Sequence, residues 1–123
     1  MTTRKSHMQR GKGFEPDLMR WFRDQGYDCE RLALAGSLDE GDLVVKGFIV
    51  NDIPIDVIVE AKAPGASNRI DLSGWLNEAD IERNNYAKAR NKEPLDILRL
   101  VVIKARNKSI KDAYVVQRLD DIF

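Results

Sequence analysis

The sequence predicts an α/β fold in which helices flank a mixed β-sheet, in the order α-β-β-β-α-β-β. Two segments, 14–25 and 71–91, carry apolar residues at helical spacing. Five shorter segments are rich in β-branched residues and are separated by turn-forming residues. One predicted helix precedes a central hairpin and the other follows it, which favours a mixed sheet between them.

The first helix is predicted from an apolar stripe that ends at Gly26, and Pro16 fits its first turn, where no amide hydrogen is missed. The stripe consists of Phe14, Leu18, Trp21 and Phe22. The second helix has an apolar face made of Leu72, Trp75, Leu76, Ala79 and Tyr86. Each face predicts packing against a sheet.

The strands are predicted at 27–34, 42–50, 53–63, 98–105 and 113–119. Asn51 and Asp52, a favourable turn pair, join the second strand to the third, so we expect a hairpin there. The loop at 35–41 leads into this hairpin, and residues 64–69 break the pattern after it. The strand positions therefore place a hairpin between the two helices.

The third predicted strand ends in opposite charges on one face. Side chains alternate along a strand, so Glu60 and Lys62 point to the same side as Asp56 and Ile58. The apolar opposite face consists of Ile55, Val57, Val59 and Ala61. In the second strand, Asp42 is predicted on the face of Val44, Lys46, Phe48 and Val50. Charged residues on a strand that otherwise favours burial indicate a functional site.

With 123 residues, the chain is predicted to form one domain at 14–123, preceded by a basic, flexible arm at 1–13. The single cysteine, Cys29, and the lack of a leader or a long apolar run favour an intracellular, cytoplasmic setting without a membrane.

Net charge is zero, but the charges form blocks. Residues 1–12 carry four basic residues and no acidic one, residues 83–111 carry nine basic residues against two acidic ones, and residues 38–82 carry ten acidic residues. Such blocks indicate cation binding in the centre and phosphate binding around it, while the alternative is a set of solvated faces.

Antiparallel pairing brings the start of one strand beside the end of the other, so Asp42 and Glu60 can converge. Two carboxylates suit Mg²⁺ or Mn²⁺, which prefer oxygen ligands. Lys62 beside the metal can polarise an attacking water, and the cation offsets charge on the phosphorane. These groups suffice for phosphodiester hydrolysis.

One motif of this sequence resembles the PD-(D/E)xK nuclease motif. It consists of Asp42, seventeen further residues and then Glu60-Ala61-Lys62. The wider pattern resembles the archaeal-type Holliday junction resolvases and their phage and bacterial relatives, over roughly residues 9–104. This pattern is RGKGFEPDLMRWFRDQGYDCERLALAGSLDEGDLVV, followed by VIVEAK. One departure is Gly41, since a proline or valine usually precedes the aspartate. The resemblance implies a restriction-endonuclease-like fold.

The resemblance also implies site roles. Asp42, Glu60 and Lys62 fall on the family's catalytic residues, Glu15 falls on the helix glutamate that completes the metal site, and Arg31 and Ser37 fall on family residues at the first strand end and in the loop. We expect Arg10, Lys12, Arg31 and Ser37 to bind DNA. Plainer interpretations remain for three of the residues that the resemblance singles out. They are Glu15 as a helix cap, Arg31 as a surface ion-pair partner and Ser37 as a loop residue.

Two further features carry weaker expectations. Glu82 and Tyr86 are similar to a Gln-xxx-Tyr feature of some relatives, although core packing of Tyr86 is favoured. Asp56 shares the face of Glu60 but lies about 13 Å away at strand rise, so it is interpreted as structural or supporting.

The first functional hypothesis is a homodimeric, metal-dependent endonuclease that resolves four-way DNA junctions by paired cuts. The first alternative is a nuclease of the same superfamily that acts on other DNA, in restriction or repair. The second is a non-catalytic DNA-binding module of the same fold. The intact set of acids speaks against the module, because without cleavage nothing would offset the repulsion of like charges.

Overall fold

The computed structural model describes residues 3–32, 41–65 and 69–123, with side chains from residue 13 onward. Its helices are α1 (Thr3–Asp24) and α2 (Leu72–Ala89), and its strands are β1 (Asp28–Arg31), β2 (Leu43–Val50), β3 (Ile53–Lys62), β4 (Leu98–Ile103) and β5 (Tyr114–Val116). Three short 3₁₀ helices are η1 (Pro94–Asp96), η2 (Ile110–Asp112) and η3 (Leu119–Asp121). The predicted order α-β-β-β-α-β-β is confirmed.

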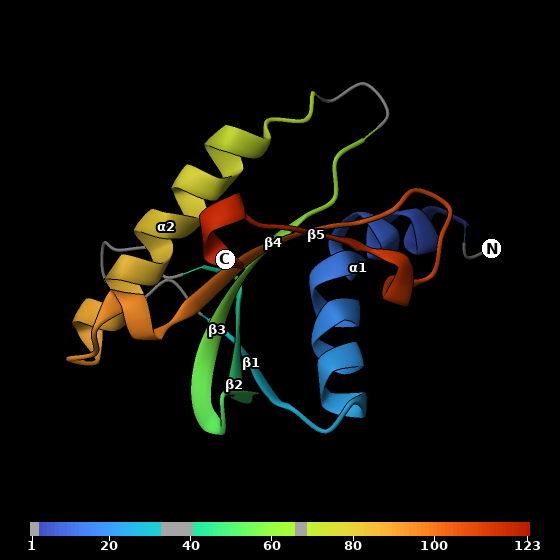
Figure 1. Cartoon of the computed structure of the whole chain (residues 1–123). Helices are drawn as coiled ribbons and strands as arrows, with labels where there is room; N and C mark the ends of the chain where they lie inside the picture. Colours follow the sequence, from blue (N-terminus) through green and yellow to red (C-terminus); the bar gives the residue numbers. More distant parts are fainter. Residues whose placement is uncertain (1–2, 33–40, 66–68) are drawn as a thin grey trace.

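The strands form one mixed sheet in the order β1-β2-β3-β4-β5. β3 and β4 pair in parallel, whereas the other neighbours are antiparallel. The parallel pair needs a long crossover, and α2 supplies it. Figure 1 shows α1 and α2 on opposite sides of the sheet. The fold is therefore a three-layer α/β arrangement.

Each face of the hairpin packs against one helix. On the α1 side, Phe14 and Leu18 contact a buried cluster of strand residues. This cluster contains Leu43, Val45, Val57, Val59 and Val102. On the α2 side, Val44 and Ile58 pack with Tyr86 and Ala87, while Leu76 and Ala79 pack with Val101 and Ile103. The predicted alternation in β3 is confirmed, and it directs Glu60 towards α2.

A β-bulge changes the predicted alternation in β2. Val45 pairs with Val57 but Phe48 pairs with Ile55, so β2 contains one extra residue between these pairs. Gly47 lies in this bulge with φ of +78°, a conformation that glycine adopts easily. Phe48 consequently packs on the α1 side, and its predicted place on the face of Asp42 is wrong.

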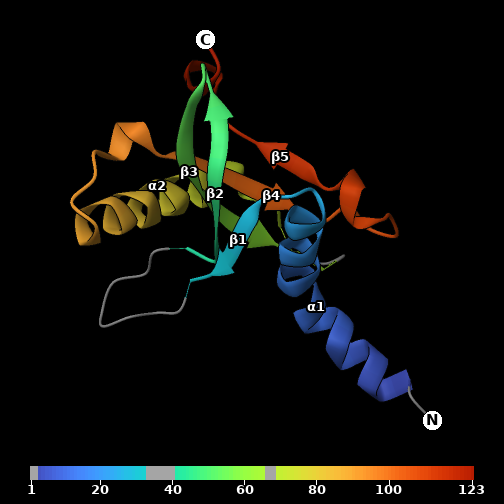
Figure 2. The same ribbon diagram turned by 90° about the horizontal axis from the view of Figure 1, so that it is seen from below.

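The first helix is longer than predicted. It begins at Thr3, and Pro16 lies inside it, not in its first turn. Figures 1 and 2 show that α1 changes direction and that its N-terminal part projects from the sheet. Proline lacks an amide hydrogen and its ring meets the preceding turn, which favours a bend. The division into an arm and a domain at residue 13 stays a prediction.

The remaining differences lie at element ends. β5 is confined to Tyr114–Val116, and residues 119–121 form η3. Leu72 is exposed at the start of α2, whereas Leu76, Ala79 and Tyr86 are buried as predicted. The Asn51-Asp52 turn is confirmed, since both residues have positive φ and Val50 pairs with Ile53.

Candidate active site

Asp42 lies just before β2, opposite the end of β3. Its Oδ2 accepts a hydrogen bond of 2.7 Å from the amide of Ala61, and its own amide donates to the carbonyl of Val59 at 3.2 Å. Two bonds to the neighbouring strand thus fix both the backbone and the carboxylate of Asp42. They place it beside Glu60, so the structure brings these two predicted residues together.

The environment of the two acids favours their protonated forms. Burial, followed by the hydrogen bond and charge of Glu60, raises the pKa of Asp42 from 3.8 to about 7. Burial, followed by a hydrogen bond with Glu82, raises the pKa of Glu60 from 4.5 to about 8. Nearby carboxylates in a buried place disfavour their joint ionisation. A divalent cation would offset this repulsion.

Lys62 extends from the end of β3 towards α2. Its Nζ lies 3.8 Å from Oε1 of Glu60 and 3.3 Å from Oε1 of Glu78. It also lies 5.7 Å from the ring centroid of Trp75, within the range of a cation–π contact. The ammonium is therefore held at the rim of the acidic site, between β3 and α2.

Asp56 is engaged elsewhere on the same face of β3. Its Oδ2 accepts hydrogen bonds from the Tyr86 hydroxyl at 2.8 Å and from Lys92 at 3.0 Å. Burial raises the pKa of Asp56, but these two bonds outweigh burial and hold it below the ordinary value. Asp56 thus joins β3 to the C-terminal end of α2.

Glu15 and Arg31 pair with each other. Nε of Arg31 lies 3.2 Å from Oε1 of Glu15, which joins α1 to the end of β1. Among the described residues, the carboxylates gathered within 4.8 Å of one another are those of Glu60, Glu78 and Glu82, and neither Glu15 nor Asp42 is one of them. Its predicted role as a metal ligand stays a prediction.

The structure does not describe the side chains of the other predicted DNA-binding residues. Ser37 lies outside the described residues, and Arg10 and Lys12 belong to the part of α1 whose side chains are not described. Both residues belong to the N-terminal half of α1. Their contact with DNA stays a prediction.

Helix α2 brings two glutamates that were not among the predicted site residues. Glu82 is 2% exposed and lies on the buried face of α2, between Ala79 and Tyr86 in the helical stripe. Glu78, one turn earlier, lies at the exposed rim and contacts Lys62. An acid on an apolar helical stripe was the available signal, because such a side chain is rarely buried without a partner or a cation.

The donors around Glu60 fit a hard divalent cation. Glu60, Glu78 and Glu82 each offer one carboxylate oxygen, and these atoms lie within 4.8 Å of one another. The buried Oε2 of Glu60 receives no hydrogen bond from the described part of the chain. An all-oxygen donor set of negative charge suits Mg²⁺ or Mn²⁺ better than a softer metal. The acidic cluster can therefore bind a metal.

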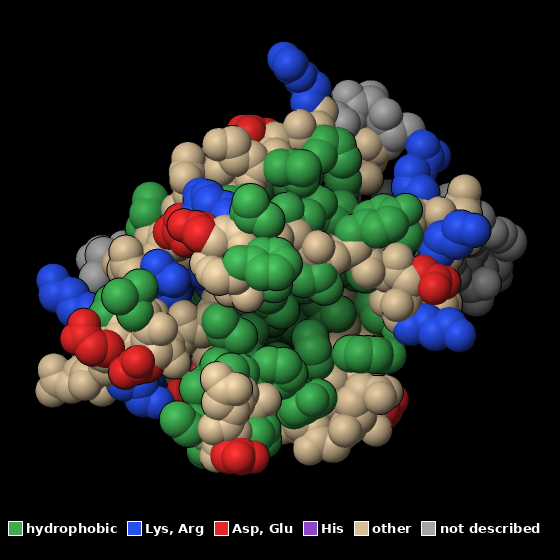
Figure 3. Space-filling model, in the orientation of Figure 1, with side chains coloured by type: hydrophobic (Ala, Val, Ile, Leu, Met, Phe, Trp, Pro, Cys, Tyr) green, Lys and Arg blue, Asp and Glu red, His purple; other side chains and the backbone are tan. Residues whose placement is uncertain are grey.

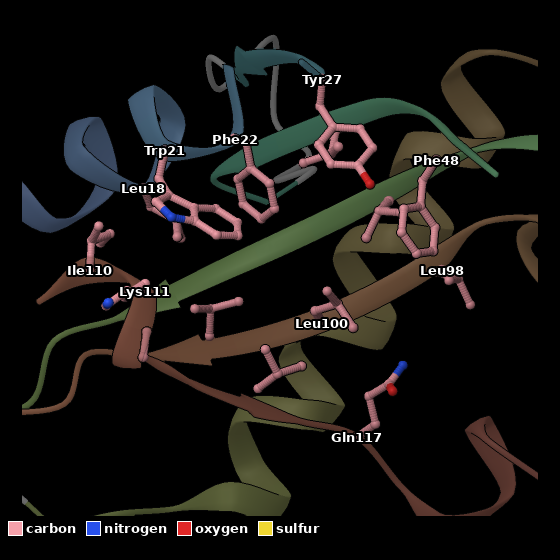
Figure 4. A pocket seen from close by; sticks show the side chains of 15 residues that line it. Leu18, Trp21, Phe22, Tyr27, Phe48, Leu98, Leu100, Ile110, Lys111 and Gln117 are labelled. Carbon is pink, nitrogen blue, oxygen red and sulfur yellow. The ribbon is translucent and has the colours of Figure 1, made fainter. Parts of the chain in front are cut away.

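An apolar groove of about 380 Å³ lies on the other face of the sheet. Figure 4 shows side chains of α1, including Trp21 and Phe22, facing Leu98 and Leu100 of β4 across it. Apolar side chains gather around this hollow in the space-filling view (Figure 3). Because the groove is on the α1 side and Glu60 faces α2, the groove is not part of the acidic site.

Comparisons with known proteins give one structural similarity. No family model matches the sequence, and no curated protein matches it. The structure is similar to that of Hjc, a Holliday junction resolvase from the archaeal hyperthermophile Archaeoglobus fulgidus. The sequences are 16% identical, the match covers 78% of this chain and 68% of that chain, and the TM-score is 0.49. At this identity the similarity says nothing about the roles of individual side chains.

No helix among the described residues has the length and apolar character needed to cross a membrane.

Proposed function

We propose that this chain is a Mg²⁺- or Mn²⁺-dependent DNA endonuclease that cuts four-way junctions. The observation that supports this most strongly is the grouping at the end of β3. Asp42 is fixed by the Ala61 amide, Glu60 is buried beside it, and Lys62 lies 3.8 Å from Glu60. Two acids and one lysine at a strand end match the chemistry of phosphodiester hydrolysis.

Each side chain has a distinct part in this proposal. Asp42 and Glu60 hold the cation, which when bound supplies positive charge to the phosphate and to the attacking water. The ammonium of Lys62 orients that water by hydrogen bonding and offsets the charge that grows on the phosphate oxygens. Hydrogen bonding to the Ala61 amide keeps Asp42 in place throughout, so the site is organised before DNA arrives.

The choice of a branched substrate rests on the sequence. The motif from Arg10 to Lys62 resembles junction resolvases, and basic blocks lie at residues 1–12 and 83–111 around the acidic centre. Basic flanks favour phosphate contacts along DNA arms. A nuclease of the same superfamily that cuts other DNA is the alternative within this chemistry.

The test compares a labelled synthetic four-way junction with the matched duplex and the single strand, with and without Mg²⁺. Symmetric cuts in the junction, dependent on Mg²⁺, are expected. Cutting of the duplex at an equal rate would favour the alternative nuclease. Binding without cutting in both Mg²⁺ and Mn²⁺ would contradict a nuclease and favour a DNA-binding module.

Three variants link the activity to the site. Asp42→Asn and Glu60→Gln should abolish cleavage while junction binding persists, because these residues hold the metal and not the phosphate. Asp56→Asn is the matched control, since it removes an acid from the same face of β3 that is bonded to Tyr86 and Lys92. Cleavage by Asp42→Asn or Glu60→Gln at the wild-type rate would overturn the assignment.

Glu15 and Arg31 form a second part of the proposal. If Glu15 acts on the metal through a water molecule, Glu15→Gln should lower the cleavage rate by less than Asp42→Asn does. If it serves only the 3.2 Å ion pair with Arg31, the variant should change thermal stability slightly and leave the rate unchanged. Arg31→Gln and Ser37→Ala should weaken junction binding if these residues contact DNA.

Paired cuts on opposing strands require two sites, so the proposal includes a two-fold symmetric homodimer. Sedimentation equilibrium of the free protein and of its junction complex measures this directly. One chain per particle, both in the free protein and in the junction complex, would contradict the dimer without affecting the chemistry proposed for one site.

A further inference from the structure

Two glutamates of helix α2 lie beside the charged residues at the end of β3. Glu60 and Lys62 are two residues apart on one face of β3, while Glu78 and Glu82 are four residues apart on one side of α2. Glu78 contacts Lys62 at 3.3 Å, and a carboxylate oxygen of Glu82 lies within 4.8 Å of one of Glu60. The two α2 acids thus have different neighbours, although both lie near Glu60.

Glu82 also reaches the segment that carries Asp42. A Cβ atom added at Gly41 would lie 3.3 Å from Oε2 of Glu82 and 2.8 Å from Cγ2 of Ile58. Gly41 has φ of +105°, so both its conformation and the lack of space require glycine. The Glu82 carboxylate therefore occupies the space between Gly41, which precedes Asp42, and Glu60.

A separate observation indicates a ligand at this place. Glu60 is 6% exposed, and its buried Oε2 receives no hydrogen bond from the described residues. A buried carboxylate oxygen without a donor is costly unless a cation or a water satisfies it. The oxygens of Glu82 and Glu78 lie within 4.8 Å of this group, so a cation bound there would meet α2.

We infer that Glu82 of α2 is the third carboxylate ligand of the divalent cation held by Asp42 and Glu60, and that Glu78 positions Lys62 beside it. This rests on the proposed function. It assigns the place predicted for Glu15 on α1 to a residue of the helix on the opposite face of the sheet. Glu78 is the less suitable ligand, because its side chain is 47% exposed and its oxygens lie 3.3 and 3.4 Å from Lys62.

The test measures Mn²⁺ affinity by isothermal titration calorimetry at fixed pH, without DNA. Glu82→Gln and Glu60→Gln should each lower the affinity at least tenfold, since loss of even an outer partner of a metal ligand costs about 10- to 100-fold. Asp56→Asn is the control and should keep the wild-type affinity, because the Asp56 carboxylate is bonded to Tyr86 and Lys92. Glu78→Gln tests the other acid of α2. It should lower the affinity less than about fivefold, because an exposed charge contributes little.

A measurement on the unaltered chain keeps the inference testable if Glu82→Gln fails to fold. Mn²⁺ broadens NMR signals of nearby nuclei, so the amide signals of residues 81–83 should broaden at lower Mn²⁺ than those of residues 14–16. Broadening that begins at residues 14–16 would overturn the inference and favour Glu15 as the third ligand.

The outcomes separate this inference from the proposed function. If Glu82→Gln keeps the wild-type affinity while Glu60→Gln loses it, Glu82 is a structural acid and the inference fails, yet the nuclease proposal stands. If the wild-type chain binds no Mn²⁺ at millimolar concentration, both fail.

Discussion

The ammonium of Lys62 lies 3.3 Å from Oε1 of Glu78, across the gap between β3 and α2. A residue at the end of a strand is thereby held by a residue on the helix that crosses over to the next strand. This contact, together with the 3.8 Å separation from Glu60, places one positive charge between a buried and an exposed acid. We expect this charge to contribute both to the stability of the metal-free protein and to the proposed chemistry.

Lys62→Ala should therefore lower the stability of the metal-free protein and abolish or greatly slow cleavage, while Mn²⁺ binding persists. The acids repel one another more strongly without the ammonium, and the attacking water loses its orienting donor. Melting in EDTA, calorimetry with Mn²⁺ and junction cleavage give the three readouts. Lys46→Ala, which removes a lysine from an exposed pair with Glu30, is the control and should keep full activity. Cleavage by Lys62→Ala at the wild-type rate would remove lysine from the mechanism.

The metal-free protein should lose stability as pH rises from about 4 to about 8. The folded chain holds protons on Asp42 and Glu60 up to pKa values of about 7 and 8, whereas the ordinary values are 3.8 and 4.5. The native state binds more protons than the unfolded state in this window, so the free energy of unfolding falls with pH. Urea denaturation in EDTA at several pH values measures the slope.

Two comparisons make the pH experiment specific. The double variant Asp42→Asn, Glu60→Gln should flatten the slope, and saturating Mg²⁺ should remove it because metal ligands must be deprotonated. Asp56→Asn should leave the slope intact, since the pKa of Asp56 is lowered and its effect falls below this window. A flat profile in the wild-type chain would show that the acids are solvated.

Gly41→Ala should destabilise the protein more than Gly26→Ala. Both glycines have positive φ, of +105° and +94°, so alanine costs roughly 1–2 kcal/mol at either position. Only at Gly41 would the new Cβ also lie 2.8 Å from Ile58 and 3.3 Å from Glu82, whereas nothing lies within 4 Å at Gly26. Urea denaturation of both variants isolates the effect of packing, and equal losses would contradict the close approach of Glu82.

A buried ion-pair network should contribute strongly to stability. Arg99 is 3% exposed, and its guanidinium contacts Asp80 at 2.6 Å and Asp121 at 2.5 Å, joining β4, α2 and η3. Arg99→Met leaves both acids without this partner, although Arg118 still pairs with Asp80. We expect a loss near the lower end of the roughly 3–5 kcal/mol that breaking a buried pair costs.

Chemical denaturation measures this loss, with Arg20→Met as the control. Arg20 pairs with Asp17 on the exposed surface of α1, where such a pair contributes about 0–1 kcal/mol. If the two variants lose equal stability, the network around Arg99 is screened by water in solution.

Junction affinity should fall steeply with salt if the basic flanks bind DNA. Replacing Arg10 and Lys12 with glutamine should reduce the slope of log affinity against log salt by roughly one unit per lost phosphate contact. Fluorescence anisotropy with a junction across a salt series measures the slope, and Arg20→Gln is the control from the same helix. An unchanged slope in the double variant would assign these charges to a solvated face.

Several features of the protein follow from sequence pattern because they depend on local periodicity. The α2 face, the Asn51-Asp52 turn and the alternation in β3 are each set by spacing of 3.6 or 2 residues, and the structure has all three. The convergence of Asp42 and Glu60 also follows, because antiparallel pairing of adjacent strands brings the start of one beside the end of the other.

The tertiary structure decided what depends on distant segments. The β2 bulge at Gly47 turned Phe48 to the α1 side, because one inserted residue reverses the alternation that follows it. The parallel crossover laid α2 over the end of β3, and only this packing placed Glu78 beside Lys62 and Glu82 beside Glu60. Sequence spacing carries no information on which helix faces which strand end, so the acids of α2 became part of the site only when the chain folded.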